Sequence, residues 1–287
     1  MEDARRRLME LVQFHCRAAK QATLVPGLTL FRSDVPSEPV RSLYDPRVCI
    51  VLQGRKQIVI DRRHIEIGPG DYLVVVLDLP VSASVIEASP VRPHLALTID
   101  LDPQLIAEMT LSETTGAEGR ATRGADTAAL TIDILEPSKR LVELLDRPAD
   151  IETLAPLIRR EIVYRLLQGE LGDMVRQCGT TGSRLSRVAR AAAWIKANFQ
   201  QPLEIAALAD MAGMSVTSFH RAFKAATAMS PLQFRTRLRL HEARRLLLLS
   251  GDRIGGIARE VGYESQSQFN REYRKMFGTS PGVDVRS

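Results

Sequence analysis

Hydrophobic and polar positions follow two different periods along this chain. From about residue 28 to residue 100, short apolar runs are separated by turn residues such as Gly54, Gly68, Pro69 and Gly70, a pattern typical of β-strands. The expected strands cover residues 48–52, 57–60, 72–77, 83–86 and 95–99. Five or more short strands at close spacing predict a β-barrel or sandwich rather than alternating strands and helices.

On both sides of this region the apolar spacing is helical. Helices are predicted over residues 1–20, 104–110, 138–145 and 151–171. The last of these has a wide apolar stripe, which would cover the barrel or pair with its copy in a dimer; the stripe contains Leu154, Leu157, Ile158, Ile162 and Leu166. Residues 110–129 are expected to form a loop. Residues 172–184, rich in glycine, are expected to be an interdomain linker.

An internal repeat occupies the last third of the chain. The segment Ala209-Asp210-Met211-Ala212-Gly213-Met214 returns 49 residues later as Ala258-Arg259-Glu260-Val261-Gly262-Tyr263. Phe219-His220-Arg221-Ala222-Phe223-Lys224 returns 50 residues later as Phe269-Asn270-Arg271-Glu272-Tyr273-Arg274, and Ser230-Pro231 returns as Ser280-Pro281. The shift of one residue falls between the glycine and the aromatic residue, where a turn tolerates an insertion.

Each copy has the anatomy of a helix-turn-helix. In the first copy, Gly213 suits the left-handed backbone of the turn, and Ser215 is the expected N-cap of the second helix. The apolar side of the first helix is expected to contain Leu203, Ala206, Ala207 and Met211. Phe219 and Phe223 in one copy, and Phe269 and Tyr273 in the other, would pack inward.

The outward residues of the second helices are suited to DNA. Arginine can bond guanine with two hydrogen bonds, and glutamine or asparagine can do so with adenine. The outward set is Thr217, His220, Arg221 and Lys224 in the first copy, and Gln266, Ser267, Asn270, Arg271 and Arg274 in the second. A helix beginning at Pro231 would hold the two units about 34 Å apart. Its Arg235, Arg237 and Arg239 would lie near backbone phosphates.

Net charge separates the same two regions. Residues 184–287 carry 17 Lys and Arg against 8 Asp and Glu, a net charge of +9, whereas residues 1–183 carry 22 against 26, a net charge of −4. A basic segment on an acidic chain is expected of a module that binds a polyanion. The alternative is an ordinary helical bundle with a solvated basic face, but a bundle does not require the repeated glycine, aromatic and basic positions.

The repeat also carries a family resemblance. Residues from about 185 to 287 resemble the C-terminal domain of AraC/XylS-type bacterial transcription regulators, most specifically over 229–234 and 262–269. The resemblance implies base contacts from Thr217, His220, Arg221, Gln266, Ser267, Asn270 and Arg271. Independently of the resemblance, Lys224, Arg235, Arg237 and Arg274 are the expected phosphate contacts.

Residues from roughly 24 to 170 resemble the N-terminal domain of one branch of that family. The resemblance rests on 44–46, 52–56, 69–73, 78–81 and 93–95, and it implies a cupin-like β-barrel for effector binding and dimer formation. The expected fold is therefore α+β, with a cupin-like barrel and following helices in 1–171, a linker in 172–184 and an all-α DNA-binding domain in 185–287. RNA polymerase is an expected further partner.

The barrel offers little inorganic or catalytic chemistry. His64 and Glu66 are two residues apart, but His64 lies in an apparent turn and His94 is the only other histidine of the region, so no metal and no cofactor are expected. Cys49 is either a small buried core residue or a thiol that senses an electrophile. His94 either faces the barrel mouth or caps a strand. Arg32, Tyr44 and Asp78 are further candidates for effector binding because polar residues near barrel ends commonly line pockets.

Three function classes follow. A ligand-responsive transcription regulator is the leading hypothesis, ahead of an enzyme with a DNA-binding appendage and of a ligand-independent architectural DNA binder. No Ser/His/Asp set, Cys/His set or glycine-rich phosphate loop has an interpretable spacing, so catalysis is not expected. Three widely spaced cysteines and an N-terminus without an apolar leader predict a cytoplasmic protein. No apolar run is long enough to suggest a membrane span.

Overall fold

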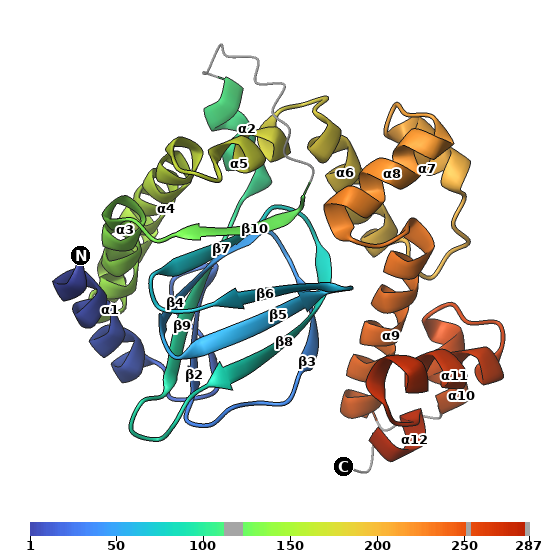
Figure 1. Ribbon diagram of the computed structural model, residues 1–287, viewed down its shortest axis with the longest axis horizontal. Helices are drawn as coiled ribbons and strands as arrows, with labels where there is room; N and C mark the ends of the chain where they lie inside the picture. The colour runs from blue at the N-terminus through green and yellow to red at the C-terminus, as the bar shows by residue number, and fades with distance from the viewer. Residues whose placement is uncertain (112–122, 251–253, 285–287) are drawn as a thin grey trace.

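A computed structural model describes residues 1–111, 123–250 and 254–284, and shows a β-barrel with helices on two sides (Figure 1). Six strands form an antiparallel sheet in the order β1(Lys20–Ala22), β2(Leu28–Ser33), β9(His94–Asp100), β4(Arg47–Gln53), β7(Asp71–Val75) and β10(Ala125–Ala129). Four strands form a second antiparallel sheet in the order β3(Val40–Tyr44), β8(Leu79–Glu87), β5(Arg55–Ile60) and β6(Arg63–Ile67).

Strands β4, β7 and β9 are buried on both faces. One face of each strand points into the barrel. The outer faces of β4 and β9 are covered by α1(Glu2–His15). Together with α3(Ile132–Glu143) and α4(Ile151–Gln168), α1 forms the helical layer at the left of Figure 1. Double coverage explains why these strands have continuous apolar runs rather than alternation. The expected strands 48–52, 57–60, 72–77, 83–86 and 95–99 all lie in this barrel, with ends shifted by at most four residues.

Two expectations from the sequence are wrong in this region. His64 belongs to strand β6 and not to a turn, because Arg63 to Ile67 pair with β5 in register. Strand β10 occupies the end of the expected loop 110–129, because it pairs with β7 at the sheet edge. The expected loop also includes residues 112–122, which lie outside the described residues.

The stretch 172–184 is not an extended linker. Most of it is helix α5(Gly172–Gly179), which packs on α2(Pro103–Leu111) and buries Met174 and Val175. Gly179 packs directly against Ile106 and Thr110. A Cβ at this position would lie 2.7 Å from the Ile106 side chain, so there is no room for a larger residue. Close packing, rather than flexibility, accounts for this glycine.

The C-terminal helices lie on the opposite side of the barrel from α1 (Figure 1). They are α6(Arg184–Ala197), α7(Ile205–Met211), α8(Val216–Thr227), α9(Pro231–Ser250), α10(Ile254–Glu260), α11(Gln266–Phe277) and α12(Pro281–Asp284). The long helix α9 connects the two halves of this region. Ser230 caps it as expected, because its hydroxyl accepts a hydrogen bond from the Gln233 amide at 3.2 Å.

Two hydrophobic cores hold the molecule together. The larger one runs from the barrel and its helices into α6, α7, α8 and the first half of α9, which contributes Phe234 and Leu238. The smaller one is confined to the second half of α9 with α10 and α11; it contains Leu240, Ala243, Leu247, Ile257, Ala258, Val261, Tyr263, Phe269 and Tyr273. The boundary between the cores crosses α9 at Arg239, whose guanidinium donates to the carbonyl oxygens of Phe199 at 2.6 Å and Gln200 at 2.9 Å.

Candidate nucleic-acid interface and effector site

Helices α7 and α8 form the first helix-turn-helix. Gly213 between them has a φ of 58°, and the Ser215 hydroxyl accepts a hydrogen bond from the Ser218 amide at 3.3 Å, so both turn predictions are confirmed. Phe219 and Phe223 are fully buried, as expected. The expected inner side of the first helix is wrong at Ala206, Ala207 and Met211, which are exposed, because α7 buries Leu208 and Ala209 instead. Leu203, just before α7, is half-buried and packs against the core as expected.

Helices α10 and α11 form the second helix-turn-helix. Gly262 has a φ of 91°, and the Ser265 hydroxyl accepts from the Gln268 amide at 3.4 Å. Phe269 and Tyr273 are fully buried, and the Tyr273 hydroxyl donates to Asp284 at 2.6 Å. Burial raises the pKa of Tyr273, and the contact with Asp284 raises it further, so this phenol stays protonated and holds α12 against α11.

The residues expected to read bases lie together on the outer faces of α8 and α11. Thr217 and Arg221 are exposed on α8, and His220 is half-buried beside the Phe219 ring. The four on α11 are all exposed, namely Gln266, Ser267, Asn270 and Arg271. Helical spacing brings Gln266, Ser267, Asn270 and Arg271 to one side of the helix, where a DNA groove would meet them together.

The residues expected to contact phosphate divide into two groups. Lys224 and Arg274 are exposed near the C-terminal ends of α8 and α11. Arg235 donates to the carbonyl oxygen of Gln201 at 3.2 Å. Arg237 forms an ion pair with Asp61 at 3.0 Å, at the turn between β5 and β6 of the barrel. In this arrangement Arg237 therefore joins the two parts of the chain.

A second ion-pair cluster also joins the barrel to the C-terminal helices. The Lys196 ammonium on α6 lies 2.6 Å from a carboxylate oxygen of Asp45 and 2.7 Å from one of Asp78. Burial raises the pKa of Asp78. At Asp45 burial acts in the same direction, but the hydrogen bonds with Lys196 and Asp78 and the charges of Lys196 and Arg47 together outweigh it, so the pKa of Asp45 is lowered. Nearby, the Gly124 amide donates to the Ala226 carbonyl at the end of α8 at 2.9 Å.

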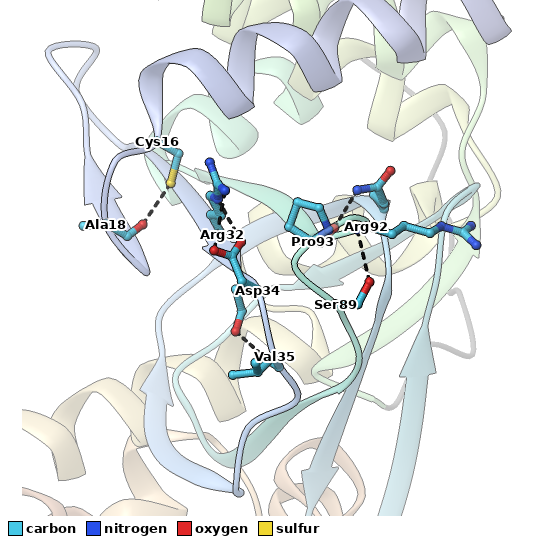
Figure 2. Close-up of polar contacts among 10 residues, drawn as sticks. Cys16, Ala18, Arg32, Asp34, Val35, Ser89, Arg92 and Pro93 are labelled. Carbon is cyan, nitrogen blue, oxygen red and sulfur yellow. Dashed lines mark hydrogen bonds and ion pairs between the residues drawn. The ribbon is translucent and has the colours of Figure 1, made fainter.

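Two of the expected effector residues lie outside the barrel interior. Asp78 is engaged with Lys196, as described above. Figure 2 shows Arg32 turned toward Asp34, with its Nε 3.0 Å from the Asp34 carboxylate. Arg32 pairs in register with Leu95, so its side chain is on the sheet face opposite to that of its neighbour Phe31.

Tyr44, Cys49 and His94 are buried within the barrel. Burial raises the pKa of the Cys49 thiol. Burial, followed by the charge of Lys56, lowers the pKa of His94 to about 4. Both side chains are therefore neutral at pH 7.

The sequence reasoning missed Lys56, which lies beside these groups. Its ammonium is 5.5 Å from the ring centre of Phe31 and 5.4 Å from that of Tyr44. The sequence contained a signal for it, because Lys56, Ile58 and Ile60 occupy every second position of β5 and therefore share one face of the strand. Both isoleucines are buried. A lysine in phase with two buried isoleucines is expected on the inner face.

Among the described residues, no group of three or more His, Cys, Asp or Glu side chains is arranged to hold a metal ion. Within the same ranges, no helix combines the length and apolar character needed to cross a bilayer.

Comparison with known proteins addresses the family. A family model described as the AraC-type transcriptional regulator N-terminus matches residues 24–174, and a helix-turn-helix domain model matches residues 208–286. The transcriptional activator RhaS of Pectobacterium carotovorum is 33% identical over 147 residues, covering 51% of this chain and 53% of RhaS. RhaS of Escherichia fergusonii is 29% identical over 149 residues, 51% and 52% of the two chains. The chain thus spans about half the length of the curated relatives it matches.

Solved structures extend the likeness of fold to nearly the whole chain. ToxT of Vibrio cholerae, in its P21 crystal form, has a TM-score of 0.58 at 10% sequence identity, covering 93% of this chain and 98% of ToxT. A strand-rich N-terminal part followed by a helical helix-turn-helix part is therefore a shared α+β architecture. The chain belongs to the family of AraC-type transcriptional regulators.

Proposed function

We propose that this protein regulates transcription by binding a specific DNA sequence through both helix-turn-helix units, under the control of a small molecule in the barrel. The observation that carries the proposal is the pair of exposed polar and basic faces on α8 and α11, in a region of net charge +9. Lys224 and Arg274 supply phosphate contacts, and Arg221 and Arg271 supply base contacts. RNA polymerase is the expected further partner, and the cytoplasm the expected location.

The contacts between barrel and C-terminal helices give the control its physical basis. Lys196 and Arg237 attach α6 and α9 to Asp45, Asp78 and Asp61 of the barrel. A ligand can change DNA affinity only as far as it binds one arrangement of the two parts more tightly than the other, and this coupling free energy is typically about 1–3 kcal/mol. DNA must then change ligand affinity by the same factor. A structure of ToxT with an unsaturated fatty acid bound supports a small-molecule effector for this fold.

The protein is further proposed to act as a homodimer through α4. The apolar stripe of α4, expected to cover the barrel or to pair with its copy, is only partly inward, because Ile158, Ile162 and Leu166 are buried while Leu154 and Leu157 are 39% and 61% exposed. Exposed apolar side chains on one helix face are suited to a second copy of the chain. Sedimentation of the full chain with Leu157→Glu should show a monomer where the unaltered chain shows a dimer.

The central test is selection of duplex fragments by the purified full chain, followed by titration of a selected and a scrambled site at several salt concentrations. Affinity for both should fall steeply with salt, because neutralised phosphates release counterions, and the selected site should bind at least about 10³-fold more tightly. Equal affinity for both would support an architectural DNA binder instead. Turnover of a candidate effector by the full chain would support an enzyme with a DNA-binding appendage.

A further inference from the structure

Lys56 places a positive charge on the inner face of the barrel. None of the ion pairs found within residues 1–111, 123–250 and 254–284 includes its ammonium, which lies between the rings of Phe31 and Tyr44. Aromatic faces attract a cation, but they carry no formal negative charge. Lys56 is half-buried, and an ammonium partly withdrawn from water is stabilised by an ionic partner, so this position is suited to an anion.

The strand register brings several small or polar side chains to the same interior face. Cys49 of β4 pairs with Thr98 of β9, and Phe31 of β2 pairs with Ala96 of β9. Residues paired directly across antiparallel strands point to the same side of the sheet. Because Phe31 contacts Lys56 from the other sheet, that side is the space between the two sheets.

Two buried polar atoms on this face lack partners. His94 and Thr98 lie on β9 at positions that share a face, and they are only 2% and 4% exposed. Neither Nδ1 of His94 nor Oγ1 of Thr98 has a hydrogen-bond partner among the described residues. Buried polar atoms are nearly always hydrogen-bonded, so these two atoms are available to bond a polar group of a ligand that binds near the Lys56 ammonium.

The electrostatics of this face select the charge of the ligand. The pKa of His94 is lowered to about 4 and that of the Cys49 thiol is raised, burial being the main cause in each, so neither carries charge at pH 7. Burial alone would lower the pKa of Lys56, but Tyr44 and Cys49 raise it, and the ammonium stays protonated. Arg47, at the start of β4, is already paired with Asp45 at 3.1 Å. The unpaired charge on this face is therefore the single positive charge of Lys56.

We propose that Lys56 is the anion-binding residue of the effector site, and that the effector is a small molecule with one carboxylate on an apolar body. The inference rests on the proposed function, whose effector it assigns to a chemical class. Thr98 and His94 would bond the carboxylate or an adjacent polar group, and Phe31, Val51 and Ile58 would contact the apolar body. A phosphate monoester fits less well, because its charge of about −1.5 to −2 would leave negative charge buried.

The site also adjoins the contact between the two parts of the chain. Tyr44 contacts Lys56, and the next residue, Asp45, binds Lys196 of α6 at 2.6 Å. Arg47 lies over the Tyr44 ring at 5.2 Å and also binds Asp45. A carboxylate that draws Lys56 away from Tyr44 therefore acts on the same turn that holds α6.

The test measures binding of octanoate, benzoate and naphthoate, each beside its uncharged amide, to the full chain by calorimetry. At least one carboxylate should bind, and its amide should bind at least about tenfold more weakly, because a hydrogen bond to a charged group is worth more than a neutral one. Lys56→Met should remove that preference, whereas Lys20→Met, an exposed lysine on β1, should keep it. Equal binding of acid and amide, or binding unchanged in Lys56→Met, would overturn the proposal.

Thr98→Val supplies a second test that does not depend on the folding of Lys56→Met. Replacing an orphaned hydroxyl by a methyl group of the same shape should raise the melting temperature of the free protein and weaken carboxylate binding about fivefold. Unchanged carboxylate affinity would remove Thr98 from the site. If none of the three acids binds at millimolar concentration, while the same protein recognises its selected DNA, the carboxylate site alone is rejected. If the unaltered protein does not recognise a specific DNA sequence, the proposed function is rejected.

Discussion

The two helix-turn-helix units repeat one sequence pattern but occupy different surroundings. The first unit, α7 and α8, shares its hydrophobic core with the barrel through α6. The second unit, α10 and α11, has a core of nine residues of its own. The same glycine, serine cap and aromatic pair thus serve one unit that is anchored to the barrel and one that is attached mainly through α9.

The contacts across the molecule follow this division. Lys196, the carbonyl of Ala226 and Arg237 bind the barrel from α6, α8 and the first half of α9. The second unit approaches the barrel through the ring of Phe277, whose centre lies 5.5 Å from the Arg41 guanidinium on β3. We infer that the barrel influences the first unit directly and the second unit chiefly through the position of α9.

The largest expected difference between the units is at their turn glycines. A Cβ at Gly262 would lie 2.4 Å from the Gln200 carbonyl oxygen, whereas one at Gly213 would meet only the end of Arg187 at 3.3 Å. Both residues have positive φ, which costs a residue with a Cβ about 1–2 kcal/mol. Gly213→Ala should lower the free energy of unfolding by that amount.

Gly262→Ala should lower the free energy of unfolding further, by about 2–5 kcal/mol in all, because the clash with backbone adds an overpacking cost. Urea unfolding of both variants measures the difference. Equal losses would mean that the second turn is as open as the first, contrary to the contact with Gln200.

Acid should loosen the second unit before the first. His241 of α9 lies 6.1 Å from the Phe277 ring centre, and its pKa is lowered to about 4 by burial and then by Arg237, Arg41 and Arg244. A lowered histidine pKa means that the unfolded chain binds the proton first. The contribution of neutral His241 to the free energy of unfolding is therefore fully present above the ordinary histidine pKa of about 6.5. It is lost as the pH falls toward 4, and the loss is about 2 kcal/mol at pH 5.

Hydrogen exchange of α8 and α11 amides, corrected for intrinsic rates, at pH 7 and pH 5 checks this expectation. In the unaltered chain α11 should lose more protection than α8. His241→Gln cannot charge, so α11 of that variant should lose less. Equal losses in both helices would show that His241 does not act on the second unit alone.

The DNA contacts of the units should differ in kind as well as in place. Arg271→Ala should cost about 1–3 kcal/mol at the selected site and relax base preference at one position. Lys224→Ala should weaken all sequences alike and lower the salt slope by about 1. Titration of selected and single-base variant sites with both proteins makes the comparison. Uniform weakening by both variants would exclude Arg271 from base reading.

The smallest effect is expected where the first unit contacts the barrel. Lys196→Met removes an ion pair whose side chain is 39% exposed, so solvent screening limits its worth to about 1 kcal/mol or less. The Gly124 amide, bonded to the Ala226 carbonyl, should then exchange about two- to fivefold faster, while α11 amides keep their rates. Lys275→Met, on exposed α11, is the matched control. No change at Gly124 would mean that Lys196 does not secure this contact.

Local chemistry made the helix-turn-helix units predictable. Gly213 and Gly262 adopt positive φ, and Ser215 and Ser265 cap the following helices, because these preferences act over a few residues and need no distant partner. The expected strands were recoverable for the same reason, since alternation and apolar runs are local patterns. Residues that project outward from α8 and α11 follow from the inward aromatic pairs.

Long-range packing decided what local patterns left open. Asp78 belongs to the contact with Lys196, a residue 118 positions away, so nothing near Asp78 in the chain distinguished an ion pair from an effector contact. Helix α5 forms because α2 offers Met174 and Val175 a surface to bury against, although its glycines favour a flexible segment. Leu157 is exposed because the helices cover only one side of α4.

The amino-acid sequence by itself determined the two helix-turn-helix units, their caps and turns, and the existence of a β-rich domain before them. Only the tertiary structure decided that one unit shares the core of that domain, and that Lys56 faces Phe31 and Tyr44 across two sheets. The physical reason is the range of the interactions. Caps, turns and periodicity are encoded within a few residues, whereas burial and charge pairing depend on which distant surfaces the fold brings together.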